Sequence, residues 1–478
     1  MKNIFTTALF LIALTGMAQT SINTVKINPE RDDSQALSII GQDSLVDILI
    51  TNSKEIQHLD YQNGFQFAVL STYESPRSKY GEISGYEVKP DGEINVYYSN
   101  SRKNKFCMVT INPTTKESVI NEMDFRLKKE TYLQGISHNN KFYILSIDYD
   151  AKLKLYEFDG LNNQVFELKT GAIKFEPRSD GSPNYLNTVL KSGGTSQMGS
   201  SLVDLIDAES PNSIETASKT NKLYTFQDHF ILTIDRDEER THALRISLTD
   251  KTVDVKTFDQ PVEDFDRNRK DSNSYLYDGK LFQTLVSRDK LVLTITEFET
   301  KEQLKKVVLL KDEDIQIANS AIIQEGGEFS SYRELENTSQ LLRKMTSATP
   351  GIPVYKIGGQ YEITLGGSKE LASGGAPMMM GFGLGGAIGG LIVSAVVNPT
   401  LGAYNSYTRT KSTYFISLFD EQFNHQPGEV QQNVFDRISS FTDGKDPLIE
   451  TVFRYKGDFI YGYYNKDEDA YELVRFMD

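Results

Sequence analysis

The sequence predicts an all-β fold, and three observations support this prediction. The chain of 478 residues contains 25 Tyr and 26 Phe but no Trp, and aromatic residues fit best on pleated strands. Asp-Gly pairs recur along the chain, where they are typical of hairpin turns and strand ends. Apolar and polar residues alternate in short segments, as Leu244, Ile246 and Leu248 do with the polar residues between them. The chain is therefore expected to consist mainly of β-hairpins.

The first 18 residues predict a secretory signal peptide. A positive charge at Lys2 is followed by an apolar stretch over residues 4–14 and by a small residue, Ala18, at the expected cleavage site. The apolar stretch is too short to span a bilayer. It is not followed by a cysteine, so a lipoprotein is not expected. Cleavage after Ala18 would send the mature chain to the periplasm, the outer membrane or the extracellular space.

Five segments share one pattern, in which a short aromatic-rich strand, a tight polar turn and a second alternating strand follow one another. Four of them are continuous hairpins, at residues 141–159, 228–250, 280–298 and 458–477. The fifth is split, because a long insertion separates its strands at 360–366 and 412–420. Two further strand pairs are expected upstream, 64–71 with 81–88 and 93–99 with 105–112.

The spacing of these hairpins indicates a repeat. The hairpins that begin at residues 228 and 280 lie 52 residues apart, close to the ~40–50 residues of a four-stranded propeller blade. In this spacing the chain resembles the β-propeller superfamily, with blades of kelch-like or WD-like length that lack the signature motifs of those families. The resemblance implies a single propeller domain over residues 19–478 with about six to eight four-stranded blades, seven being the expected number. A strand at residues 22–27 is expected to complete the last blade and close the ring.

Three segments are expected to form short helices packed against blade edges. Two are nearly the same heptapeptide, SLVDILI at residues 44–50 and SLVDLID at residues 201–207. The third, residues 332–345, has apolar residues at positions 335, 341, 342 and 345. A docking motif shared by the two heptapeptides is the alternative interpretation.

The insertion within the split hairpin has an unusual composition. Residues 371–408 are 38 consecutive residues without a charged side chain, in a chain of which 24% of the residues are charged. Gly381, Gly385 and Gly389 recur every four residues, a spacing that on a helix lets another backbone pack closely. The apolar residues expected to contact a partner or a membrane are Met378, Met379, Met380, Phe382, Leu384, Ile388, Leu391, Ile392 and Val393. We expect this segment to protrude from a face whose other turns are acidic.

Three interpretations of residues 371–408 stay open. The first is a glycine-rich loop folded over the propeller's own surface. The second is contact with a membrane or with an apolar groove of a partner protein. The third is a transmembrane helix, since its apolar centre is long enough to span a bilayer.

Residue types that carry chemistry do not form a recognisable motif. The five histidines lack the spacing of metal ligands, although His229 and His242 could face each other across one hairpin. Acidic residues recur at the hairpin turns around residues 148, 235 and 467, where solvated turns are expected and calcium sites are the alternative. Paired carboxylates for glycoside hydrolysis depend on a three-dimensional separation, so this possibility also stays open. Catalytic residues, metal ligands and a cofactor are not predicted.

Composition narrows the choice of function. The 66 acidic and 51 basic residues give a net charge of −15, which argues against nucleic acid as a partner. A single cysteine, Cys107, excludes an intrachain disulfide and a cysteine-based metal site.

These observations favour an exported, non-catalytic binding or scaffold protein of the cell envelope. Residues 371–408 would contact a protein partner or a membrane surface, and a small-molecule substrate is not expected. The alternative is an extracytoplasmic propeller hydrolase or lyase that acts on glycans.

Overall fold

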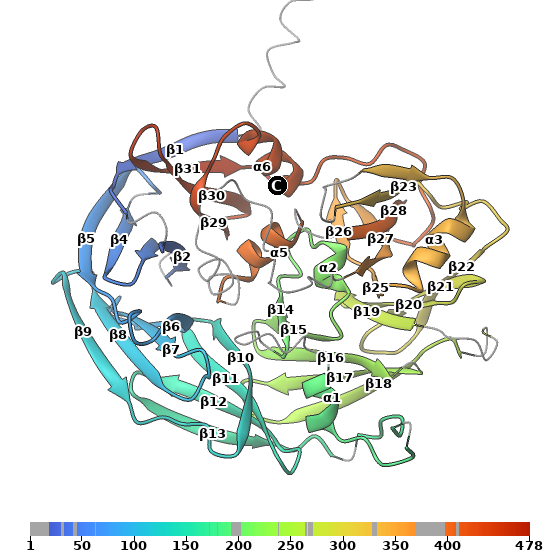
Figure 1. Ribbon diagram of the computed structural model, residues 1–478, viewed down its shortest axis with the longest axis horizontal. Coiled ribbons are helices and arrows are strands. Elements are labelled where there is room, and N and C mark those ends of the chain that lie inside the picture. The colour runs from blue at the N-terminus through green and yellow to red at the C-terminus, as the bar shows by residue number, and fades with distance from the viewer. Residues whose placement is uncertain are drawn as a thin grey trace, which may run out of the picture.

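The strands of the protein form a ring of sheets. The computed structural model describes residues 19–29, 33–41, 45–62, 64–171, 173–178, 180–192, 202–237, 239–262, 265, 271–326, 332–369, 397–407 and 411–478. In these residues seven sheets follow one another around the ring (Figure 1). The predicted signal peptide, residues 1–18, lies outside the described residues.

Sheets 1 to 3 each contain four antiparallel strands that run in chain order from the inner to the outer side of the ring (Figure 1). Sheet 1 contains β2 (Gln35–Ile40), β3 (Val46–Thr51), β4 (Glu55–Gln62) and β5 (Phe67–Glu74). Sheet 2 contains β6 (Glu82–Val88), β7 (Ile94–Ser99), β8 (Phe106–Asn112) and β9 (Glu117–Met123). Sheet 3 contains β10 (Glu130–His138), β11 (Lys141–Asp148), β12 (Leu153–Asp159) and β13 (Asn162–Leu168).

Sheets 4 and 6 vary this plan, whereas sheet 5 keeps it. In sheet 4 a short strand is added in parallel to the first of four antiparallel strands: β14 (Asp204–Ile206), β15 (Asn221–Phe226), β16 (His229–Asp237), β17 (Arg240–Ser247) and β18 (Val253–Asp259). Sheet 5 contains β19 (Asp271–Tyr277), β20 (Lys280–Val286), β21 (Lys290–Glu297) and β22 (Gln303–Leu310). Sheet 6 is built around the long pair β27 (Gln360–Lys369) and β28 (Lys411–Phe419), with β23 (Ile322–Glu325), β24 (Arg333–Leu335), β25 (Thr349–Gly351) and β26 (Val354–Ile357).

Sheet 7 uses strands from both ends of the chain. Its order is β29 (Leu448–Tyr455), β30 (Asp458–Asn465), β31 (Ala470–Phe476) and then the N-terminal β1 (Gln19–Lys26). β1 pairs antiparallel with β31, so the N-terminal strand occupies the position expected for residues 22–27. This ring of mainly antiparallel sheets is a β-propeller, and the predicted all-β fold class is confirmed.

The apolar core lies between neighbouring sheets. Leu155 of sheet 3 and Leu244 of sheet 4 belong to one buried cluster, and Ile39 of sheet 1 and Val96 of sheet 2 belong to another. Inner strands are buried on both faces, as the uniformly buried β3 shows. Each sheet therefore depends on its neighbours for burial of its apolar residues.

Short helices occupy the connections between strands. They are α1 (Leu186–Ser192), α2 (Ile214–Ala217), α3 (Thr338–Met345), α5 (Pro399–Tyr407) and α6 (Val434–Thr442). Within the described ranges no helix is long and apolar enough to cross a membrane.

Two of the three predicted helices are wrong. Residues 46–50 belong to strand β3, and residues 204–206 form strand β14. A short segment with few polar residues fits a strand buried on both faces as well as a helix, and its apolar pattern does not separate the two. In the third segment the helix begins only at Thr338, where the Asn337 side chain accepts a hydrogen bond from the amide of Gln340 and caps it.

The predicted pairing of residues 64–71 with 81–88 is also wrong. Both segments are strands, but β5 is the outer strand of sheet 1 and β6 is the inner strand of sheet 2 (Figure 1). The pairing of residues 93–99 with 105–112 is present as β7 and β8. The split hairpin is present as β27 and β28, whose register runs from Tyr361 opposite Phe419 to Lys369 opposite Lys411.

A buried ion pair within sheet 4 is hydrogen-bonded to sheet 5. Lys222 Nζ lies 2.8 Å from Asp235 Oδ2, and both side chains are fully buried. Lys222 Nζ also donates a hydrogen bond to Asn273 Oδ1 at 2.7 Å, on the first strand of sheet 5. Asp235 accepts further hydrogen bonds from Thr241 and Ser274. Asp235 is therefore a buried network residue, and the expectation of a solvated turn at this position is wrong because Lys222 compensates its charge.

Substitution of Lys222 by Met should destabilise the fold strongly. The variant leaves the charge of Asp235 buried without its cation, which costs about 3–5 kcal/mol of unfolding free energy. Chemical denaturation measures this loss. As a control, Lys152→Met breaks an exposed ion pair with Glu167 and should leave the unfolding free energy nearly unchanged. An equal loss of unfolding free energy in the two variants would contradict the role of Lys222 in compensating the buried charge of Asp235.

Candidate functional site

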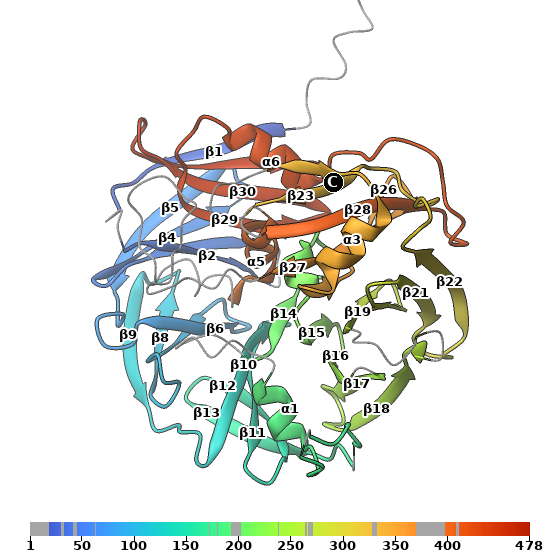
Figure 2. The same ribbon diagram turned by 45° about the vertical axis from the view of Figure 1, so that its right-hand side comes forward.

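A helix lies inside the ring of sheets. Figures 1 and 2 show α5 and α2 within the ring, near its inner strands. α5 contacts β29, β14 and α2, which come from sheets 7 and 4 and from the connection after β14. Its start follows a local signal, because Pro399 is its first residue and Asn398 Oδ1 accepts a hydrogen bond from the amide of Leu401 at 3.1 Å.

Buried polar contacts fix α5 from several sides. Asn398 Nδ2 lies within hydrogen-bond distance of Ser38 Oγ (3.1 Å) and of the carbonyl oxygen of Val452 (3.0 Å), which belong to sheets 1 and 7. Thr400 Oγ1 donates to Asp207 Oδ2 at 2.7 Å, directly after β14. Ser406 Oγ lies 2.6 Å from Thr216 Oγ1 of α2. The helix is thus tied to opposite sides of the ring.

The C-terminal part of the uncharged segment does not protrude. Within residues 397–407, the side chains of Val397, Leu401 and Tyr404 are buried. Val397 packs in the core between sheets 1 and 2, and Leu401 and Tyr404 pack with α6 and sheet 7. The expectation of a protruding segment over all of residues 371–408 is therefore wrong for its last third, where charged residues are absent because the chain fills the interior.

The predicted contact residues lie outside the described residues. These are Met378, Met379, Met380, Phe382, Leu384, Ile388, Leu391, Ile392, Val393 and the glycines Gly381, Gly385 and Gly389. The described chain ends on one side of them at Lys369, the last residue of β27, and resumes at Val397.

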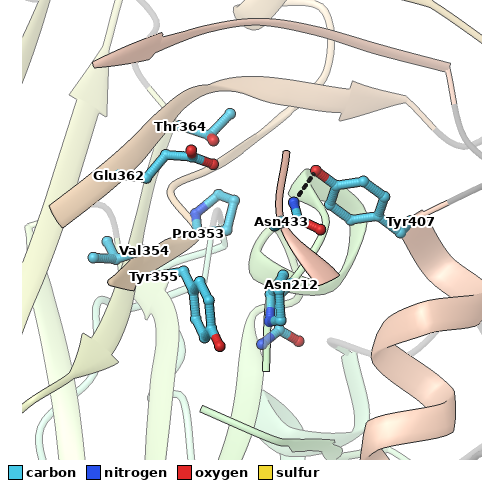
Figure 3. A pocket seen from close by; sticks show the side chains of 9 residues that line it. Asn212, Pro353, Val354, Tyr355, Glu362, Thr364, Tyr407 and Asn433 are labelled. Atoms are coloured by element: carbon cyan, nitrogen blue, oxygen red, sulfur yellow. Dashed lines mark hydrogen bonds between the residues drawn. The ribbon is translucent and has the colours of Figure 1, made fainter. Parts of the chain in front are cut away.

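A small pocket lies where α5, α6, sheet 6 and the loop before α2 meet. Its volume is about 20 Å³, room for about one water molecule. Glu362 and Thr364 project from the same face of β27, and Asn433 and Tyr407 lie across the pocket from them (Figure 3). Asn433 Nδ2 donates a hydrogen bond to the Tyr407 hydroxyl at 2.7 Å. Tyr355 and Asn212 complete the wall.

Glu362 is the distinctive group of this pocket. The residue is 8% exposed, and its Oε2 has no hydrogen-bond partner among the described residues. Burial raises the pKa of the Glu362 carboxyl to about 7, with a smaller contribution from the negative charge of Asp436. A group that titrates near neutral pH in a pocket is a candidate for binding or proton transfer.

Further acidic groups surround Glu362. Asp436 lies in the first turn of α6, where it forms a capping box with Asn433, and burial together with the charge of Glu325 raises its pKa. Glu325 accepts a hydrogen bond from the Tyr414 hydroxyl at 2.6 Å. Burial and the charges of Asp436 and Glu362 raise the pKa of Tyr407. The pocket therefore lies in a negative electrostatic environment.

The histidines and the acidic turns have local partners. In the described part of the chain, no group of three or more His, Cys, Asp and Glu residues is placed to hold a metal ion. His229 and His242 do not face each other, because their register partners are Ser247 and Ile234. The Asp148 side chain accepts hydrogen bonds from the amides of its own turn, as a solvated turn does.

Sequence reasoning missed Glu362, Asp436 and Asn398. Local signals exist for two of them: Asn398 precedes a proline, and Asn433 and Asp436 have the spacing of a capping box. Glu362 lies in an ordinary strand pattern, and only the approach of α5 and α6 sets it apart.

Comparison with known proteins found similarity to solved structures only. No family model and no curated protein matches the chain. Among solved structures, the chain is similar to the WD40 domain of SCAP from fission yeast, with 9% identity and a TM-score of 0.29 over 96% of this chain and 98% of that one. It is similar to a prolyl endopeptidase, with 8% identity and a TM-score of 0.34 over 94% of this chain and 50% of that one.

A third similar structure is dihydro-heme d1 dehydrogenase NirN in complex with DHE, with 11% identity and a TM-score of 0.26. That match covers 56% of this chain and 45% of the dehydrogenase. The chain thus spans about half the length of this dehydrogenase and of the endopeptidase. All three are propeller-type folds, and similarity at this level carries no argument about activity.

Substitution of Glu362 by Gln should change how stability depends on pH. The folded state raises the pKa of this carboxyl, so its contribution to stability is complete below about pH 4 and is lost as the pH rises through about 7. Between pH 4 and pH 8 the wild type should lose about 3 kcal/mol more unfolding free energy than Glu362→Gln. Denaturant unfolding across this range measures the difference, and parallel pH profiles would contradict the burial of an unpaired carboxyl.

Proposed function

We propose that the chain is an exported, non-catalytic binding or scaffold protein of the cell envelope, which contacts a protein partner or a membrane through residues 371–396. The proposal is based on the observation that the residues on both sides of this segment are held in the ring. It begins after β27, a strand of the central pair of sheet 6, and ends at Val397 in the core between sheets 1 and 2. The ring thus supplies two fixed attachment points.

Fixed ends favour binding by an uncharged segment. Association costs conformational entropy, and a segment whose ends are already held has less of it to lose. The sequence of residues 371–396 contains no charge, and its run of methionines at 378–380 suits contact with irregular apolar surfaces. Asn398 and Thr400 follow the segment closely in sequence, and their hydrogen bonds hold its C-terminal end to the ring.

The sequence supports export. Residues 1–18 have the charge, the apolar stretch and the small residue of a signal peptide. Strand β1, Gln19–Lys26, lies wholly after the predicted cleavage site. Removal of the signal peptide would therefore leave the strand that completes sheet 7 intact.

A substitution variant tests the segment without shortening the connection between β27 and Val397. Changing the nine apolar contact residues to serine should leave thermal unfolding unchanged, because the ring and α5 are retained. It should abolish sedimentation of the protein with the envelope fraction, because the apolar contact is lost. Sedimentation equal to that of the wild type would contradict the proposal.

A matched control keeps the composition of residues 371–396 and scrambles their order. If the scrambled variant still sediments with the envelope fraction, the partner is a membrane, because membrane binding depends on apolar composition and not on residue order. If its sedimentation is lost, the partner is a specific protein. The alternative, a hydrolase or lyase acting on glycans, stays a prediction, and turnover of a glycan by the purified chain would favour it over our proposal.

A further inference from the structure

The proposed function makes no use of the pocket at Glu362. Such a pocket would be unremarkable if its polar groups were satisfied within the protein, as they are around the buried pair Lys222 and Asp235. Glu362 differs, because its Oε2 is buried and has no hydrogen-bond partner among the described residues. A buried carboxylate oxygen in that state lacks compensation for its lost hydration, so a donor in the pocket would stabilise it.

The charges around the pocket select the kind of donor. On α6, the negative charge of Asp436 raises the pKa of Glu362. The pKa of Asp436 is in turn raised by the charge of Glu325 on sheet 6 and lowered by the charge of Arg437 on α6. On α5, the Tyr407 hydroxyl accepts a hydrogen bond from Asn433, so this contact does not use the hydroxyl proton of Tyr407. The charge that acts directly on Glu362 is therefore negative, and the complementary ligand is a cation.

The volume and the lining of the pocket limit the size and the type of this cation. The volume of about 20 Å³ accommodates a group the size of a water molecule, which an ammonium head matches. The carboxylate of Glu362, the hydroxyl of Thr364 and the side chains of Tyr355 and Tyr407 line the pocket (Figure 3). A single carboxylate suits an ammonium group, whereas Ca²⁺ requires about six to eight oxygen ligands.

We propose that this pocket binds the ammonium group of a primary amine, with an N–H donating to Oε2 of Glu362. The amine is either a small free molecule or the side chain of a lysine in a peptide, since both present the same head group. The pocket lies between α5 and α6, so an occupied site would join the helix inside the ring to sheet 6.

Calorimetric titration of the full chain with ethylammonium chloride at pH 8 tests the proposal. We expect saturable binding, and binding of Nα-acetyl-lysine amide at similar strength would assign the site to a lysine side chain rather than to a free amine only. Tetramethylammonium has the same charge but no N–H donor and should not compete. Absence of saturable binding, or equal binding of tetramethylammonium, would overturn the proposal.

Variants and pH separate the pocket from general attraction to an acidic protein. Glu362→Gln should weaken ethylammonium binding at least about tenfold, since a charge-assisted hydrogen bond is lost. The control Glu421→Gln removes an exposed carboxylate and should leave binding unchanged. For the wild type, affinity should rise about tenfold from pH 6 to pH 8, because the cation replaces the proton on Glu362. An ethylammonium affinity that does not change with pH would contradict binding at Glu362, even if the Glu362→Gln variant failed to fold.

Discussion

The hydrogen bonds of the Asn398 side chain join the first and last sheets of the ring at its centre. They reach Ser38 on β2 and the backbone of Val452 on β29, two inner strands that lie far apart in sequence. A buried amide of this kind is stable only when it is hydrogen-bonded, so α5 and the inner strands specify each other's position. Since α5 ends at Tyr407, which forms one wall of the Glu362 pocket, the same contact also sets the geometry of the candidate site.

Two buried acidic groups show how partners decide the state of a carboxyl. Asp235 has Lys222, Thr241 and Ser274 within hydrogen-bond distance, and it serves to join sheets 4 and 5. Glu362 is similarly buried but lacks a cation, and burial raises its pKa to about 7. The first arrangement is a satisfied structural network, whereas the second leaves a binding capacity that the fold does not use.

Strand patterns in the sequence were sufficient to predict the four continuous hairpins, because each depends on local alternation and a local turn. The pairing of residues 64–71 with 81–88 was predicted wrongly, because alternation alone does not show whether two neighbouring strands belong to one sheet or to two. The pairing of β27 with β28 has no local turn and was predicted from the matching strand patterns on either side of the insertion. The heptapeptides at residues 44–50 and 201–207 were misjudged, because segments buried on both faces lose their alternation. The pocket could not be predicted, since Glu362, Tyr407 and Asn433 meet only through the packing of α5 and α6 against sheet 6.

Hydrogen–deuterium exchange of the α5 amides tests the placement of this helix inside the ring most directly. The amides of residues 402–407 should exchange as slowly as those of β29, because opening α5 requires breaking the buried contacts of Asn398 and Thr400. Exchange as fast as that of the exposed turn at Asp150 would contradict the account, since α5 would then lack the tertiary protection that fixes both the end of the uncharged segment and the wall of the pocket.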